Sequence, residues 1–275
     1  MKKVLSIAGS DCSGGAGIQA DLKTFSAHGV FGMSVIVSVV AENTSRVIGF
    51  QDISPEVIDG QIDAVFEDIE VDAVKVGMLS CERTMRTVAE KLKEYRPSGV
   101  VIDPVMYAKN GSPLMDPGAI DALIAYVLPL AYVLTPNIPE AEKIAGFEIK
   151  NREDVKKAAG SIVGMGPRSV LIKGGHALHE GGDAVDVLYD GTEFSYYSSP
   201  RIDTKNTHGT GCTYSSAIAS NLALGLPLGK AIARAKRYVS TAIEHALPIG
   251  KGNGPTHHFY DLYLHGLRTE DGGDE

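Results

Sequence analysis

Short apolar runs rich in β-branched residues alternate along this chain with segments whose apolar residues recur at helical spacing. The runs that predict strands are 3–9, 33–41, 72–79, 99–106, 132–137 and 169–176. The segments that predict helices are 17–28, 58–69, 85–92, 214–225 and 228–246. Such alternation predicts an α/β fold with a mostly parallel sheet and helices on both faces. Residues 184–198 add a hairpin, because Asp190-Gly191 separates two further runs.

No linker or shift of composition divides the chain, so we predict one domain over residues 1–267. With 44% hydrophobic residues, a chain of 275 residues has ample material for a buried core. Residues 268–275 are polar and acidic, and we predict that they form a disordered tail.

Composition narrows the possible functions. The net charge is −8 and no basic run is present, which disfavours nucleic-acid binding. No run of about 18 apolar residues occurs, so no membrane span is expected. The three cysteines are widely spaced and form no CxxC pair. This pattern predicts a cytoplasmic protein without a disulfide framework or a zinc site.

Polar and glycine residues collect where the predicted strands end. Asp103 follows one strand, Asn137 and Glu140 follow the next, and Lys173 ends the one after. In open α/β sheets, ligands bind beyond the carboxyl ends of the strands. We therefore expect the binding site at this edge of the sheet.

The stretch Gly209-Thr210-Gly211-Cys212 lies directly before a predicted helix of small residues. Backbone N–H groups at a helix N-terminus bind anions. The carboxylates of Asp103 and Glu140 could hold Mg²⁺, and Lys173 could meet a phosphate. These are the components of a kinase, although the chain has no Walker A motif.

Six motifs then identify a family. AGSDCSGGAGIQADLKTF, KVGML, DPVM, TPNIPEAE, KGGH and NTHGTGCT resemble, in this order, the hydroxymethylpyrimidine and phosphomethylpyrimidine kinases of thiamine biosynthesis. The resemblance covers nearly the whole chain. It implies a ribokinase-like three-layer αβα sandwich with about eight strands and no separate lid domain. It also implies ATP as co-substrate, Mg²⁺ as cofactor, a homodimer, and phosphorylation of the pyrimidine's CH₂OH group and then of the monophosphate.

The resemblance assigns the site position by position. The pyrimidine pocket would be lined by Ala16, Asp21, Glu42, Met78 and Val105. The nucleotide would contact Asn137, Lys173, Thr207 and Lys236, with Asp103 and Glu140 at the metal. The anion hole and catalytic position would comprise Gly209, Thr210, Gly211 and Cys212.

Two of these positions leave alternatives open. Many ribokinase-like enzymes carry Asp as general base where this family has Cys212. Since a helix N-terminus lowers a thiol pKa, the thiolate could be the base, or Cys212 could only pack against the substrate. Glu42 lies in AENT, where the family commonly has AQNT. The identity of the substrate is therefore less firmly implied than the reaction.

Two other functions are compatible with the same fold. Some pyridoxal kinases share the GTGC cysteine but carry a second cysteine in the loop after DPVM. Here Ala108 stands at that place, which argues against a pyridoxal kinase. A catalytically silent ligand sensor on the same fold is disfavoured, because Asp103, Glu140, Lys173 and the GTGC motif are all present.

Overall fold

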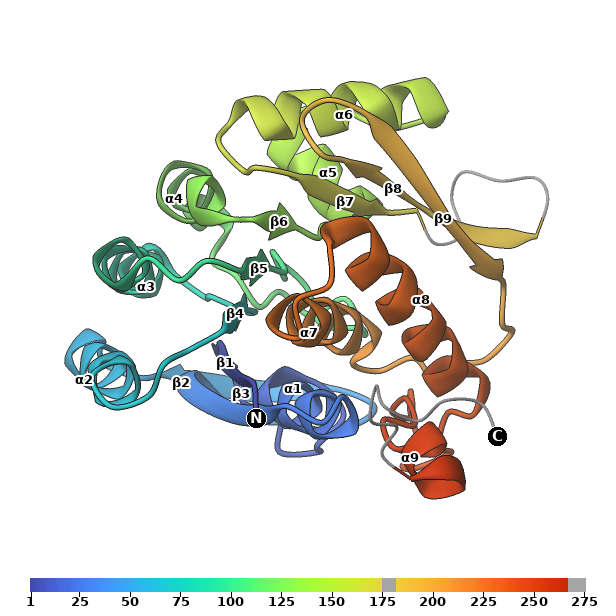
Figure 1. Cartoon of the computed structure of the whole chain (residues 1–275), viewed down its shortest axis with the longest axis horizontal. Helices are drawn as coiled ribbons and strands as arrows, with labels where there is room; N and C mark the ends of the chain where they lie inside the picture. The colour runs from blue at the N-terminus through green and yellow to red at the C-terminus, as the bar shows by residue number, and fades with distance from the viewer. Residues whose placement is uncertain (175–181, 267–275) are drawn as a thin grey trace.

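The computed structural model describes residues 1–174 and 182–266. Their strands form one sheet in the order β3-β2-β1-β4-β5-β6-β7-β8-β9 (Figure 1). The strands are β1 (Lys3–Gly9), β2 (Phe31–Glu42), β3 (Val47–Asp52), β4 (Ala73–Val76), β5 (Val100–Ile102), β6 (Val133–Leu134), β7 (Val170–Lys173), β8 (Asp183–Tyr189) and β9 (Phe194–Pro200). The predicted tail, and residues 175 and 176 of the predicted run 169–176, lie outside the described residues.

Neighbouring strands from β2 to β7 are parallel, whereas β3, β8 and β9 add antiparallel pairs at the two edges. The ribokinase-like fold class without a separate lid is confirmed, with nine strands in the described chain instead of about eight. The β8–β9 hairpin turns at Asp190 as predicted. The edge strand β3 was not predicted.

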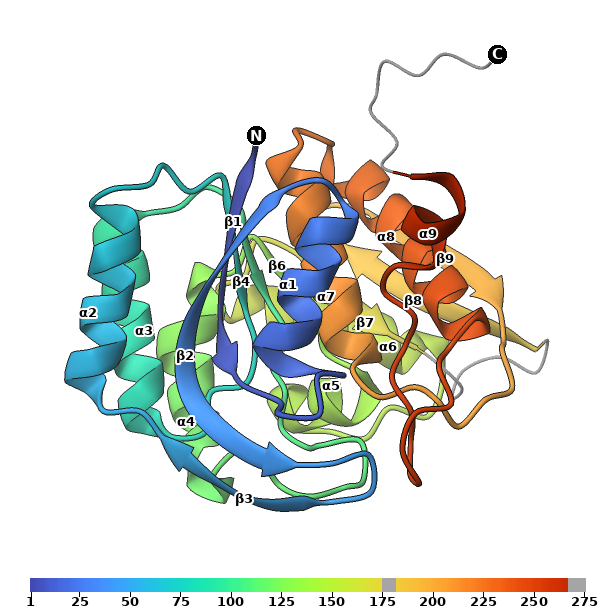
Figure 2. The ribbon, with the colours of Figure 1, turned by 90° about the horizontal axis from the view of Figure 1, so that it is seen from below.

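Helices cover both faces of the sheet (Figures 1 and 2). On one face lie α1 (Gly17–Ala27), α7 (Thr210–Ala223) and α8 (Leu228–Glu244). On the other lie α2 (Pro55–Phe66), α3 (Glu82–Tyr95), α4 (Ile120–Ala122), α5 (Ile138–Ala145) and α6 (Arg152–Gly164). Short helical turns flank α4, and α9 (Tyr260–His265) follows α8. None of the helices in the described ranges meets the length and apolarity that a bilayer crossing needs.

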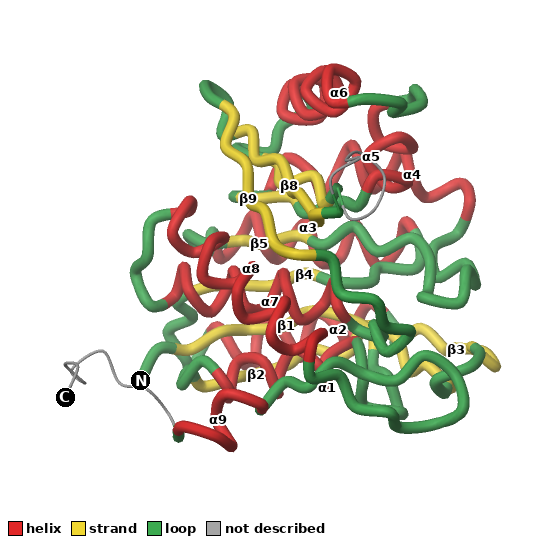
Figure 3. Tube along the Cα trace, turned by 90° about the vertical axis from the view of Figure 1, so that its right-hand side faces the viewer, coloured by secondary structure: helices red, strands yellow, loops and turns green. Residues whose placement is uncertain are grey.

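Two apolar cores result from the alternation of side chains along each strand. Leu5 and Ile7 of β1 belong to the core on the side of α2 and α3, whereas Val4 belongs to the core on the side of α1, α7 and α8. The same alternation runs through β4 to β7, which explains why these strands are apolar on both faces except at Lys75 and Lys173. Figure 3 shows α7 and α8 in front of the strands, on the face of the sheet that they cover.

The central strands are shorter than the apolar runs predicted. β5 ends at Ile102, where Asp103-Pro104 follows, and β6 keeps only Val133 and Leu134 before Pro136. Proline has no N–H and cannot continue a ladder. The polar residues after each strand therefore lie in loops at the carboxyl edge, where they line one cavity.

Candidate active site

A cavity of about 740 Å³ opens at the carboxyl edge of the sheet. The structure brings nearly all of the predicted site residues to its wall, although their roles stay predictions. Those that line it are Ala16, Glu42, Met78, Asp103, Val105, Asn137, Glu140, Lys173, Thr207, Gly209, Thr210, Gly211, Cys212 and Lys236.

The N-terminus of α7 forms one wall of the cavity. Gly209 has φ 77°, and a side chain there would collide with the carbonyl of Gly15. The N–H of Thr210 donates to Thr207 O and that of Thr213 to Gly209 O. The N–H groups of Gly211 and Cys212 make no hydrogen bond to any other residue that the structure describes. They are thus available to an anion at the positive end of the helix dipole.

Cys212 differs from the expectation for a helix N-terminus. Burial raises the pKa of its thiol to about 11, and the nearby Lys75 ammonium only partly offsets that effect. The thiol is therefore protonated at neutral pH in the absence of ligands. The direction is opposite to the lowering of the pKa expected at a helix N-terminus, because the thiol is desolvated and Asp21 and Asp103 add negative charge nearby.

The lysine predicted for the phosphates and the carboxylates predicted for the metal meet next to Gly211 of α7. Lys173 Nζ lies 2.7 Å from Asp103 Oδ1, which also accepts from Thr135 Oγ1 at 3.1 Å. Glu140 Oε2 accepts from the N–H of Asn137, and Asn137 Oδ1 accepts from the N–H of Glu140. This reciprocal capping starts α5 and fixes both side chains.

Lys236 of α8 reaches the cavity from a third side. Its ammonium lies 2.7 Å from Asp186 Oδ2, and the N–H of Gly174 donates to Asp186 Oδ1 at 3.2 Å. Asp186, which the sequence analysis missed, therefore connects α8 to the end of β7.

Asp21 does not lie where the sequence analysis placed it. It is fully buried and is not among the residues lining the cavity. Its carboxylate accepts from Ser6, from Ser216 of α7 and from the ammonium of Lys75. Because α1 turns this side chain toward α7 and the sheet, Asp21 joins these elements in the interior and does not line a pyrimidine pocket.

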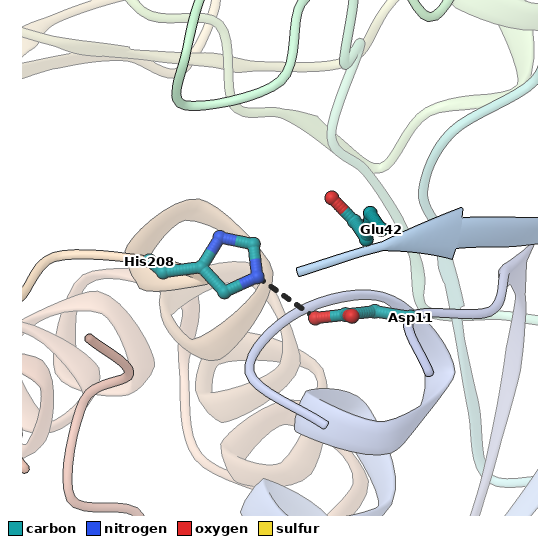
Figure 4. A group of neighbouring side chains, drawn as sticks. All are labelled: Asp11, Glu42 and His208. Atoms are coloured by element: carbon teal, nitrogen blue, oxygen red, sulfur yellow. Dashed lines mark hydrogen bonds and ion pairs between the residues drawn. The ribbon is translucent and has the colours of Figure 1, made fainter. Parts of the chain in front are cut away.

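A further group at the cavity was also missed. His208 Nε2 lies 2.8 Å from Asp11 Oδ2, and both side chains are buried. Figure 4 shows this pair beside Glu42, which ends β2. Asp11 and His208 are 197 positions apart, so no local spacing could have connected them. The signal available was that each lies inside a motif, in AGSD and in NTHGTGC.

The sheet order and this cavity make the protein a ribokinase-like kinase. A family model described as phosphomethylpyrimidine kinase matches residues 11–257. The chain belongs to this family.

Individual relatives agree with the family match. The thiamine biosynthesis bifunctional protein ThiED of Geobacter sulfurreducens is 53% identical over 255 residues, which are 93% of this chain and 52% of that protein. This chain thus spans about half the length of that relative. A phosphomethylpyrimidine kinase structure from Clostridium difficile has a TM-score of 0.79 and 48% identity, covering 88% of this chain and all of that one. A Bacillus subtilis pyridoxal kinase in an ADP complex has a TM-score of 0.87 and 41% identity, covering 96% and 99%.

Proposed function

We propose that the protein transfers the γ-phosphoryl group of ATP to the hydroxymethyl group of 4-amino-5-hydroxymethyl-2-methylpyrimidine, and then phosphorylates the monophosphate. The observation that carries this proposal is the single cavity that contains both halves of the site. Glu42, Met78 and Val105 line the same cavity as Asp103 and Lys173. Gly211 and Cys212 also line it, and Gly211 lies beside Asp103 and Lys173.

In this proposal, positioning and charge supply the catalysis. The N–H groups of Gly211 and Cys212 bind the oxygens of the transferring phosphoryl group. Lys173, whose pKa is raised by Asp103 and Glu140 despite burial, stays charged and meets the phosphates. Since Cys212 is protonated, we assign it a contact role at the reacting hydroxyl instead of that of a standing thiolate base.

Asp103 and Glu140 fit a magnesium ion. Both are buried carboxylates on the cavity wall, and oxygen ligands of this kind suit Mg²⁺. Burial, together with the charge of Asp103, raises the pKa of Glu140 to about 7 although Lys173 opposes this, and a cation would favour the ionised form. When bound, Mg²⁺ would neutralise charge on the ATP phosphates. Asp103 and Glu140 would hold the ion.

Pyridoxal is the second candidate substrate, because the pyridoxal kinase of B. subtilis has so similar a structure. Ala108 lines the cavity here and provides no thiol at that place. A coupled assay of ADP release with the pyrimidine, its monophosphate and pyridoxal tests the proposal. Greater kcat/KM for both pyrimidines supports it, whereas greater kcat/KM for pyridoxal overturns the substrate assignment.

We also propose a homodimer formed through the β3 edge. Val39 of β2 and Ile48 and Phe50 of β3 are exposed apolar side chains on adjoining strands. An edge strand with unpaired backbone groups and apolar side chains favours pairing with a second copy. Light scattering on the purified protein measures the mass directly.

ATP as co-substrate and three free cysteines in the described chain favour a cytoplasmic protein.

A further inference from the structure

The end of β2 holds Glu42 against two other ionisable groups. One ligating atom each from Asp11, Glu42 and His208 lies within 4.8 Å of the other two. The backbone of Glu42 is fixed by Cys12, whose Sγ lies 3.0 Å from Glu42 O and 3.4 Å from Glu42 N. The Glu42 side chain thus extends from a fixed backbone position on the wall of the cavity (Figure 4).

Asp11 is already saturated with donors. Its Oδ2 accepts from the N–H groups of Gly15 and Ala16 and from His208, and its Oδ1 accepts from the N–H of Ser13. Although burial opposes ionisation, these bonds hold the pKa of Asp11 well below its usual range. The same donors occupy the lone pairs that a metal ion would need, so we assign no cation here.

The pKa values of His208 and Glu42 depend on each other. Burial opposes the imidazolium, but the hydrogen bond to Asp11 and the charges of Asp11 and Glu42 raise the pKa of His208. The positive charge of Lys109, from the loop after β5, lowers the pKa of His208. Burial and the Asp11 charge raise the pKa of Glu42 to about 7, and His208 offsets this only in part. Because its donors keep Asp11 ionised and Glu42 lies within 4.8 Å of it, a proton taken up by these two carboxyl groups near neutral pH resides on Glu42.

The geometry points to Asp11, held in place by His208, as the residue that keeps Glu42 in its neutral acid form, so that Glu42 binds the aminopyrimidine edge as a carboxamide would. This inference rests on the proposed function. A neutral carboxyl has one O–H donor and one carbonyl acceptor, whereas a carboxylate only accepts. The exocyclic NH₂ of the pyrimidine would donate to the carbonyl, and the ring nitrogen beside it would accept from the O–H. The specificity of the site thus extends to two residues outside the contact with the ring.

A proton balance follows. If only neutral Glu42 binds the pyrimidine, affinity falls about tenfold per pH unit above the pKa of about 7. At pH 8 the free protein is mostly ionised at Glu42, so binding takes up about 0.9 proton. The variant Glu42→Gln has the same donor and acceptor without a proton to gain. It should take up about none and keep its affinity at high pH.

Calorimetric titration with the pyrimidine alone, at pH 8 in buffers of different ionisation enthalpy, measures this uptake. The parent, Glu42→Gln and His208→Gln are compared, with the exposed Glu193→Gln as matched control. His208→Gln keeps a donor for Asp11 but removes the positive charge. The affinity of His208→Gln should therefore begin to fall at a higher pH than that of the parent, whereas Glu193→Gln should behave as the parent does. Thermal unfolding checks that each variant is folded.

The alternative is that the pyrimidine ring binds protonated against ionised Glu42. A 2-trifluoromethyl analogue, whose ring nitrogen is far less basic, separates the two cases. Equal uptake with the analogue, at an affinity within about tenfold, supports a neutral Glu42. Loss of analogue binding, or equal uptake by parent and Glu42→Gln, overturns the inference. If neither protein binds the pyrimidine at any pH but both phosphorylate pyridoxal, the proposed substrate itself has failed.

Discussion

The ammonium group of Lys75 lies 2.8 Å from the carboxylate of Asp21, and both side chains are fully buried between the sheet and α7. Ser6 and Ser216 donate to the same carboxylate, so a strand, a helix and the ion pair are joined at one point. Removal of one partner leaves an uncompensated charge in a dry interior, which costs far more than the pair contributes.

The first prediction concerns this pair. Lys75→Met should lower the free energy of urea unfolding by about 3–5 kcal/mol. Asp21→Leu alone should do the same, whereas the double variant should recover most of the loss because no charge remains buried. The exposed pair of Lys2 and Asp72 gives the control, since Lys2→Met should change stability little. A double variant as unstable as the single ones would show that the pair contributes through attraction.

A half-buried histidine, His28, and a buried one, His258, should make the fold sensitive to acid. Burial lowers the pKa of His28 and of His258 to about 4. The unfolded chain then binds more protons than the folded one between about pH 4 and 6.5, so this stability is complete above pH 6.5 and is lost as pH falls. Between pH 7 and pH 5 each histidine should cost about 2 kcal/mol. Urea unfolding of the parent and of His28→Gln at pH 7 and pH 5 measures the loss of stability in each protein. An equal loss of stability in the two proteins would contradict the prediction.

Cys212 gives a kinetic prediction. Removal of a general base typically costs about 10²–10⁴ in rate. Because the thiol is protonated at neutral pH, we expect Cys212→Ala to lower kcat by less than about 100-fold. Single-turnover kinetics across pH measures the chemical step. A loss of about 1,000-fold, together with disappearance of an alkaline rise in the parent's profile, would restore the thiolate-base mechanism.

The metal prediction concerns the cavity carboxylates. Asp103→Asn and Glu140→Gln should each raise the Mg²⁺ concentration for half-maximal activity by at least about tenfold, because each removes a charged oxygen ligand. Asp190→Asn, in the exposed β8–β9 turn, is the matched control and should leave the requirement unchanged. Unchanged Mg²⁺ dependence in both cavity variants would place the metal elsewhere.

The sheet could be predicted because its central strands are apolar on both faces and end in proline or glycine. β3 could not, since it is an edge strand with exposed side chains and with Gly49 in its middle. Its place depends on pairing with β2 in space. The helical turns around α4 were also missed, because Pro117 and Pro129 interrupt their periodicity.

Within the site, motif order predicted which residues meet, because the carboxyl ends of parallel strands share one edge. It could not predict which way a helical side chain turns, so Asp21 was placed at the cavity. Nor could it predict charge states. The raised pKa of Cys212 and the bond between Asp11 and His208 depend on desolvation and on contacts between distant segments.

The position of α7 and α8 late in the chain has a consequence for synthesis on the ribosome. Val4, Val101, Val133 and Leu171 belong to strands made early, and all four are buried beneath helices that begin at residue 210. A nascent chain with only its first two hundred residues would cover this sheet face with α1 alone and would present the rest of it to water. We expect such a chain to need a chaperone until the last quarter of the protein emerges to cover it.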